Sequence, residues 1–282
     1  ARFDEQANLN LANKLQDEGA TLIYGVPGLK VHSKIIYITR KEGSKFVSYT
    51  HVGTGNFNES TAKIYSDFSL FTQDSRVTSE VEKVFHFFKN NYKAGTYKHL
   101  LVAPFYMRNK ILKLIQNEIK NAKAKKPALI QLKLNSLTDE ELIKKLYAAS
   151  HAGVKIQLII RGICSLVPGV KGMSENIEAI SLVDTYLEHA RSMLFHNNGN
   201  ELVYISSADW MVRNLDFRTE VACPIYDPQL KTEIKKIFDI QWNGSTKVRI
   251  LNEKQDNPYR QAPDGIKRRA QLEIYKYLAA KK

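Results

Sequence analysis

The sequence lacks long apolar runs, and this absence limits where the protein can reside. Nowhere in the 282 residues do about 18 consecutive apolar residues occur, the minimum for a helix that crosses a bilayer. The first residues also lack the charged-then-apolar pattern of a secretory signal. We therefore expect no membrane-spanning segment and a cytoplasmic location.

Cysteine is scarce as well. The two cysteines, Cys164 and Cys223, both lie in apolar surroundings. A disulfide between them stays open, but two buried thiols in a reducing cytoplasm are the simpler interpretation. No group of cysteine and histidine residues has the spacing of a zinc site.

Acidic residues are fewer than basic ones. The chain has 29 Asp and Glu against 42 Lys and Arg, a net charge of +13. Such a surplus attracts polyanions, among them nucleic acid, an acidic membrane surface or polyphosphate. It is also consistent with a lysine-rich solvated surface that has no specific partner, and charge alone leaves both interpretations open.

The order of the expected elements indicates the fold class. Apolar residues at helical spacing predict helices over residues 4–15, 78–88, 107–122 and 266–280. Short apolar and β-branched runs predict strands over residues 21–24, 34–39 and 47–52. Elements that alternate in this way are typical of an α/β fold.

The chain also contains an internal repeat. In the second copy we expect a strand at 128–134, a helix at 138–149 with Thr138 and Glu141 in capping-box spacing, then Gly153 and a strand at 154–160. In the first copy a helix, Gly19 and a strand follow in the same order, but the opening strand is missing. A buried parallel sheet does not normally lack its first member. We therefore expect two α/β domains related by the repeat, residues 1–101 and 102–282, the first of them truncated at its N-terminus.

Each copy holds a histidine followed two residues later by a cation. The pairs are His32 with Lys34 and His189 with Arg191. If each pair lies on a strand, period-2 alternation directs both side chains to one face. There the cation can hold phosphoryl oxygens while the neutral imidazole supplies a lone pair. A single pair of this kind is weak evidence, but two in register indicate one site in which one histidine attacks and the other protonates the leaving group.

A turn of small residues follows each pair, at residues 53–56 and 206–209. The turns end in Asn56 and Asp209, and either side chain could bond the second nitrogen of a site histidine and so fix its tautomer. The glycines of the first turn favour a cradle of backbone N–H groups for phosphate.

These paired half-sites resemble the phospholipase D superfamily. That superfamily also has an aspartate seven residues after each histidine, where this chain has Thr39 and His196, so the likeness to its hydrolases is incomplete. Longer strings resemble a narrower group, the histidine-dependent polyphosphate kinase family: RFDE at 2–5, GLKVHSK at 28–34, HVGTGNFNE at 51–59, YSD at 65–67, RGICSL at 161–166, YLEH at 186–189, SSADWM at 206–211 and RRAQL at 268–272. The resemblance covers essentially the whole chain.

The resemblance implies roles for individual residues. His32 matches the phosphorylated nucleophile of that family, and His51 matches a second important histidine. Arg2 matches a residue at the magnesium–phosphate site, where we expect it to contact the phosphates that Mg²⁺ bridges. Residues that match nucleotide-binding positions are Tyr65, Arg161 and His189, the last also an acid or transition-state partner.

It also implies a fold and an activity. The fold is two phospholipase D-like α/β domains. The activity is reversible transfer of the γ-phosphate of ATP to inorganic polyphosphate through a phosphohistidine, with Mg²⁺, and ADP as the leaving group. Phosphate oxygens would be held by Arg2, Lys34, Arg161 and Arg191. Partners would then be ATP or ADP and polyphosphate, with no specific nucleic acid; the full-length protein is expected to be a homo-oligomer, and peripheral membrane association stays open.

Two alternatives remain. A phospholipase D-like phosphodiesterase would fit the paired half-sites, but Thr39 and His196 replace its aspartates. An inactive polyanion-binding fragment would fit the charge, but both site histidines are retained.

Overall fold

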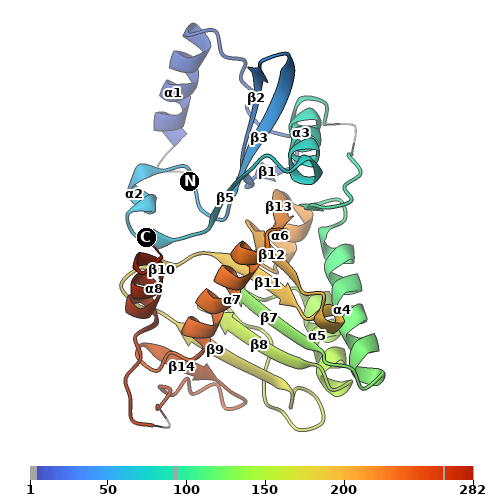
Figure 1. The fold of residues 1–282 in the computed structure, drawn as a ribbon, viewed down its shortest axis with the longest axis vertical. Helices are drawn as coiled ribbons and strands as arrows, with labels where there is room; N and C mark the ends of the chain where they lie inside the picture. Colours follow the sequence, from blue (N-terminus) through green and yellow to red (C-terminus); the bar gives the residue numbers. More distant parts are fainter. Residues whose placement is uncertain (1–4, 92–93, 263, 282) are drawn as a thin grey trace.

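The computed structural model describes residues 5–91, 94–262 and 264–281 (Figure 1). Its helices are α1 (Glu5–Asp17), α2 (Glu59–Ala62), α3 (Ser75–Lys89), α4 (Met107–Lys123), α5 (Glu140–His151), α6 (Val212–Asp216), α7 (Pro228–Trp242) and α8 (Ala270–Ala279), with a 3-10 helix at Asn197–Gly199. Within these ranges no helix is long and apolar enough to span a membrane.

A large mixed sheet forms the centre of the molecule. Its strands are β1 (Lys30–Val31), β6 (Leu101–Ala103), β7 (Leu129–Leu134), β8 (Lys155–Ile160), β9 (Ile177–Leu182), β11 (Arg191–Phe195), β12 (Leu202–Ser206), β13 (Arg218–Pro224) and β14 (Val248–Leu251). Their order is β1-β13-β12-β11-β7-β8-β9-β14, with β6 paired to β13. The neighbours β7, β8 and β9 are parallel, which agrees with the strand–helix–strand order of the second copy.

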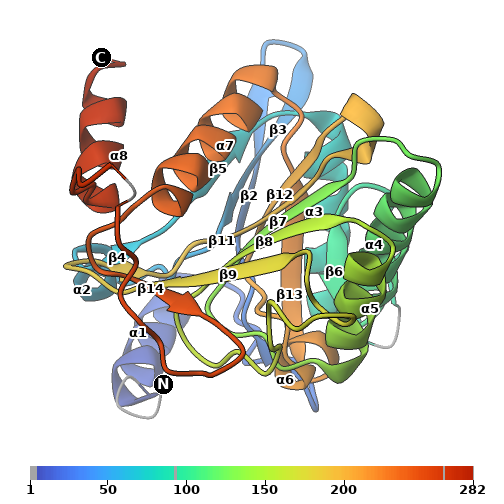
Figure 2. The same ribbon diagram turned by 90° about the horizontal axis from the view of Figure 1, so that it is seen from below.

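The strands of this sheet bury both faces. On β7, Ile130 and Leu132 lie in the same apolar cluster as residues of α4 and α5, whereas Leu194 of β11 belongs to a cluster on the opposite face. Alternate residues of a strand point to opposite faces, so helices are needed on both. Figure 2 shows α4 and α5 on one side of the sheet and α7 on the other.

The first copy contributes a smaller sheet that packs against the second. Its strands β2 (Lys34–Glu42), β3 (Lys45–Gly53) and β5 (Ser69–Thr72) are antiparallel. Ile35 and Val52 of this sheet share an apolar cluster with Val81 of α3 and with Val221 of β13. A separate two-stranded parallel pair, β4 (Tyr65–Ser66) with β10 (Leu187–Glu188), joins the two copies again.

Most expected helices and strands are confirmed, but the strand at 21–24 is wrong. These residues have no regular structure, and the side chains of Ile23 and Tyr24 are 49% and 69% exposed. A strand needs a neighbour to share its backbone hydrogen bonds, and none pairs with 21–24 in the part of the chain that the structure describes. The repeat is nevertheless visible in its glycines, because Gly19 and Gly153 both end a helix with positive φ, 87° and 91°.

The start of α5 also differs from expectation. Its N-cap is Asp139, whose carboxylate accepts a hydrogen bond from the backbone N–H of Leu142 at 3.1 Å, and not Thr138. Aspartate is the stronger capping residue of the two because its charge also meets the positive end of the helix dipole. The division of the chain at residues 101 and 102 stays a prediction, and β6 lies across it. Both cysteines are free thiols.

Candidate active site at the junction of the two copies

Each site histidine is held by a carboxylate from the other copy. Nδ1 of His32 lies 2.8 and 2.9 Å from the two carboxylate oxygens of Glu220. Nδ1 of His189 lies 2.8 and 3.0 Å from those of Asp67. The two half-sites, His32 with Lys34 and His189 with Arg191, meet at one junction, because the charges of Arg191 and Asp67 both shift the pKa of Lys34. At this junction each copy supplies the carboxylate that binds the histidine of the other copy.

Backbone pairing produces this exchange. Strand β1, which ends just before His32, pairs in parallel with the start of β13, just before Glu220. Strand β10, which ends just before His189, pairs in parallel with β4, just before Asp67. The N–H of His32 donates to Thr219 O at 3.0 Å, and the N–H of His189 donates to Ser66 O at 3.2 Å. The strand pairing and the backbone hydrogen bond of His32 are thus equivalent to those of His189, as expected for a duplicated unit.

A hydroxyl group supports each carboxylate. Thr54 Oγ1 donates to Asp67 at 2.6 Å and accepts from the backbone N–H of Phe68 at 2.9 Å. In the second copy Ser207 Oγ donates to Glu220 and accepts from the N–H of Val221 at 3.2 Å. Each carboxylate is thus held by a fixed donor on one side and binds an imidazole on the other.

The carboxylates correct the expected partners of the histidines. Asn56 is exposed, and the carboxylate of Asp209 binds Arg191 and the backbone N–H of Asn135. Neither of them is a hydrogen-bond partner of a site histidine in the part of the chain that the structure describes. One signal could have identified the true partners: Asp67 follows Asn56 by eleven residues, and Glu220 follows Asp209 by the same number.

Burial and tautomer together set the state of the two imidazoles. Burial lowers the pKa of His32 and of His189 below the usual 6.5, although Glu220 and Asp67 oppose the shift. Both rings are therefore largely neutral at pH 7. A carboxylate only accepts, so Nδ1 carries the proton in both rings. Nε2 of His32 keeps a free lone pair, whereas Nε2 of His189 accepts from Nη1 of Arg191 at 3.2 Å.

The cations beside the histidines are buried. Lys34 is 6% exposed, and burial is the main cause that lowers its pKa to about 8. Its Nζ donates to the backbone carbonyl of His32, and Nη1 of Arg191 donates to that of His189 at 3.0 Å. Arg191 also donates to Thr54 O at 3.4 Å. It thus reaches from the second copy into the first.

Two further expected residues surround His189. The ring of Tyr65 lies 4.9 Å from the imidazole of His189, centroid to centroid. Nε of Arg161 donates to Asn135 at 2.6 Å and to the carbonyl of Glu188 at 2.8 Å. Both bonds use Nε, and Nη1 and Nη2 of Arg161 have no hydrogen-bond partner among the described residues. Its terminal nitrogens can therefore meet an anion at the junction.

His51 has a different environment. It is 5% exposed on β3, and its ring lies between those of Phe57 and Phe71, at 5.3 and 4.8 Å. Its Nδ1 has no hydrogen-bond partner among the described residues. A side chain at Gly53 would stand 2.7 Å from the His51 ring, so the glycine allows the imidazole to lie flat beside the turn at 53–56.

The described residues do not offer a metal site of their own. They contain no group of three or more His, Cys, Asp or Glu side chains that could bind a metal ion, and both junction carboxylates already bind a histidine and a hydroxyl. Mg²⁺ is held in many phosphoryl-transfer sites through substrate phosphates, and the described residues fit a protein-built cage poorly. Arg2, the one expected metal-site residue, lies outside the described residues.

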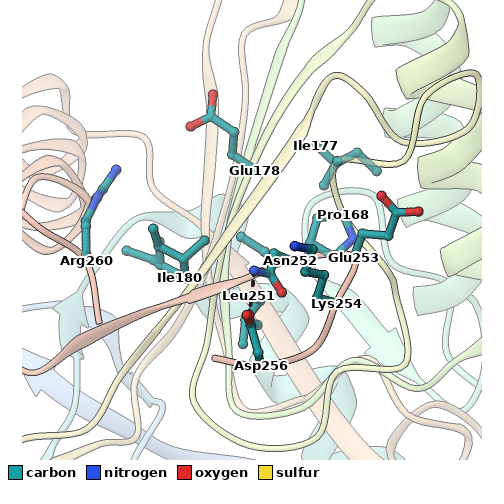
Figure 3. A pocket seen from close by; sticks show the side chains of 13 residues that line it. Pro168, Ile177, Glu178, Ile180, Leu251, Asn252, Glu253, Lys254, Asp256 and Arg260 are labelled. Atoms are coloured by element: carbon teal, nitrogen blue, oxygen red, sulfur yellow. Dashed lines mark hydrogen bonds between the residues drawn. The ribbon is translucent and has the colours of Figure 1, made fainter. Parts of the chain in front are cut away.

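A hollow of about 490 Å³ lies elsewhere, along β9 and β14 (Figure 3). Its wall carries the carboxylates of Glu178, Glu253 and Asp256 against the cations Lys254 and Arg260. This mixture does not suit a polyanion, since carboxylates would repel phosphate. The size of a hollow therefore does not identify the active site here, whereas the paired histidines do.

Comparisons with known proteins agree with this assignment. The family model described as polyphosphate kinase C-terminal domain 1 matches residues 1–94, and that described as C-terminal domain 2 matches residues 100–271. The polyphosphate kinase of Vibrio parahaemolyticus is 50% identical over 99% of this chain and 40% of its own length. That of Escherichia coli K12 is 48% identical over the same shares. The chain thus spans about two fifths of the length of these relatives.

Solved structures support the same relationship. The crystal structure of polyphosphate kinase from Porphyromonas gingivalis is 43% identical and has a TM-score of 0.91 over 97% of this chain and 42% of its own. A phosphatidylserine synthase from Haemophilus influenzae, 10% identical with a TM-score of 0.51 over 89% of this chain and 69% of its own, shares the fold alone. The expected phospholipase D-like α/β fold is thereby confirmed, and the chain belongs to the polyphosphate kinase family.

Proposed function

We propose that this chain carries the phosphoryl-transfer site of a polyphosphate kinase, and that His32 accepts the γ-phosphate of ATP. The observation that supports this most is the state of His32: its Nδ1 proton is committed to Glu220 at 2.8 Å, so Nε2 is free to attack. The second histidine faces the same junction from the other copy. A pair of imidazoles supplied by two equivalent units suits an in-line transfer between two phosphate oxygens.

In the first step Nε2 of His32 attacks the γ-phosphorus. The N–P bond forms as the bond from phosphorus to the bridging oxygen of ADP breaks, and ADP leaves with that electron pair. Lys34, Arg191 and Arg161 stabilise charge on the phosphoryl oxygens. The Nδ1 proton of His32 stays hydrogen-bonded to Glu220, which offsets the positive charge that develops on the ring.

His189 acts on the leaving group from the opposite copy. Its lowered pKa means that the free protein holds it neutral at pH 7, but phosphate charge beside it favours protonation when ATP binds. Asp67 would stabilise the imidazolium through Nδ1. His189 can then donate a proton or a hydrogen bond to the departing oxygen.

In the second step the terminal oxygen of polyphosphate attacks the phosphoryl group on His32. The N–P bond breaks, a phosphoanhydride bond forms and His32 returns to its neutral state. Because one phosphoanhydride is broken and another is made, the reaction should run in both directions. Mg²⁺ would be held by the substrate phosphates, since the residues that the structure describes do not form a cage for it.

The test is phosphoenzyme labelling of the full-length protein with γ-labelled ATP. His32→Ala should abolish acid-labile label, whereas His151→Ala, at an exposed position on α5, should retain it. Peptide mapping should find the phosphate at residue 32 and not at residue 189. Undiminished labelling of His32→Ala would contradict the proposal.

A further inference from the structure

The C-terminal helix α8 begins with a polar motif that the transfer mechanism does not use. Its N-cap residue, Arg269, donates to the carboxylate of Asp184 at 2.7–3.2 Å and to the hydroxyl of Thr185 at 2.6 Å. The side chain of Asp184 is 1% exposed. The carboxylate of this ion pair is therefore shielded from solvent. Dissolved salt screens its attraction to Arg269 less than it would screen a pair of exposed charges.

Gln271, on the first turn of α8, makes a second set of bonds to the same segment. Its Oε1 accepts from the backbone N–H of Tyr186 at 3.0 Å, and its Nε2 donates to Tyr186 O at 2.8 Å. Nε2 also donates to the carboxylate of Glu188 at 2.8 Å. One side chain thus satisfies both backbone groups of Tyr186, as a neighbouring strand would.

This segment leads directly to His189. Glu188 is buried and also binds Lys133 at 2.6 Å and Gln241 at 2.7 Å. The next residue, His189, contacts the first copy through its backbone bond to Ser66, its ring bond to Asp67 and the ring of Tyr65. Its carbonyl accepts from Asn135 and Arg191 of the second copy. Because residues 184–188 lead directly into His189, the position of the imidazole also depends on where that segment is held.

Helix α8 contributes few buried apolar side chains. Ala270 is fully buried, while Leu272 and Tyr275 are 51% and 71% exposed. Ile274 and Tyr277 are partly buried against the cluster that includes α7. The polar contacts of Arg269 and Gln271 are thus a large share of what fastens the start of α8 to the rest of the protein.

We propose that the start of α8 is a clamp that positions His189, with Arg269 and Gln271 as positioning residues. The inference rests on the proposed function, because it assigns the clamp to the histidine that acts on the leaving group. Arg269 fixes the beginning of the segment, and Gln271 fixes its end. Arg269 and Gln271 of the RRAQL string then serve the active site from a place far from His189 in the sequence.

The test is a double-mutant cycle in the full-length protein. Gln271→Met keeps the length of the side chain and removes its three hydrogen bonds. Its effect on the rate of His32 labelling is measured in the unsubstituted protein and in His189→Ala, over hours so that slow labelling is counted. Arg268→Ala is the matched control, since Arg268 pairs with the neighbouring Asp264 at an exposed position.

The clamp predicts that Gln271→Met lowers the rate roughly 10- to 100-fold, the cost of a displaced reacting group. It predicts no further loss in His189→Ala, because the histidine that the clamp serves is already absent. An equal loss in both backgrounds would show that Gln271 supports the protein in general, and no loss in the unsubstituted protein would remove the clamp altogether. Arg268→Ala should leave the rate unchanged.

Hydrogen exchange of the peptide that spans residues 184–190 provides a readout without activity. Exchange at the Tyr186 amide should become faster in Gln271→Met and stay unchanged in Arg268→Ala. Unchanged exchange in Gln271→Met would overturn the clamp. Failure of the unsubstituted protein to label would refute the proposed function instead, and the exchange result would still decide whether α8 holds this segment.

Discussion

At the scale of single residues, the junction uses burial to prepare its groups for reaction near neutral pH. The lowered pKa of His32 keeps its ring neutral at pH 7, which is the state a nucleophile needs. The pKa of Lys34 is lowered to about 8, so its ammonium is charged at pH 7 but is lost at only slightly higher pH. The pH range of activity is therefore limited by His32 on the acid side and by Lys34 on the alkaline side.

We expect kcat/KM for ATP to be bell-shaped in pH. The acid limb should lie below pH 6.5, where His32 becomes protonated, and the alkaline limb near pH 8, where Lys34 loses its proton. Lys34→Arg, with a cation that does not titrate in this range, should lower the maximum but move the alkaline limb to higher pH. If the alkaline limb stays near pH 8 in Lys34→Arg, a group other than Lys34 is responsible for that limb.

The same lowered pKa affects stability. Between the pKa of folded His32 and 6.5, the unfolded chain binds more protons than the folded one, so the contribution of His32 to stability falls as pH falls through this window. Above pH 6.5 both states are neutral and the contribution is complete. The pKa of His189 is also lowered, so the contribution of His189 to stability falls with falling pH in the same way.

At the scale of elements, helix α3 anchors the connection between the two copies. Glu80 on α3 is 3% exposed and accepts from the backbone N–H groups of Lys98, His99 and Leu100 at 2.5–2.9 Å. These three donors lie in the connection that leads into β6. One carboxylate thus fixes the path of the chain where it passes from the first copy to the second.

Glu80→Gln should lower the free energy of unfolding by about 2–4 kcal/mol, because an amide has one acceptor oxygen and sets its own N–H groups against buried donors. The change is measured by urea denaturation. Glu82→Gln on the same helix, with a side chain 47% exposed, should change stability by less than about 0.5 kcal/mol. Equal effects of the two substitutions would contradict the anchoring role of Glu80.

At the scale of the whole molecule, the exchange of carboxylates makes the two copies depend on each other. His32 of the first copy is held by Glu220 of the second, and His189 of the second by Asp67 of the first. The cores are joined as well, since Ile35 and Val221 belong to one cluster. A substitution of the carboxylate in one copy should therefore slow the reaction at the histidine of the other copy.

Glu220→Gln should slow labelling of His32 by about 10²–10⁴-fold, because an amide can donate to Nδ1 and stabilise the wrong tautomer. The measurement is the initial rate of label incorporation, mapped to residue 32. Glu178→Gln, an exposed carboxylate in the hollow of Figure 3, serves as the control and should label normally. Labelling of Glu220→Gln at the unsubstituted rate would exclude an orienting role for Glu220.

The sequence by itself determined the alternation of helices and strands, the duplicated histidine–cation pairs and the family. Apolar periodicity depends on local burial, so most elements could be predicted, and the strand at 21–24 failed because a strand also requires a neighbour. The N-cap at Asp139 was not predicted because the adjacent Thr138 is also a suitable N-cap residue.

Only the tertiary structure decided which groups hold the histidines. Glu220 lies 188 residues from His32 and Asp67 lies 122 residues from His189, so no local pattern links them. The equal spacing of the two carboxylates after their turns becomes meaningful once β1 is paired with β13 and β4 with β10. Hydrogen bonds between distant strands depend on how the two copies pack, and that packing is a property of the whole chain.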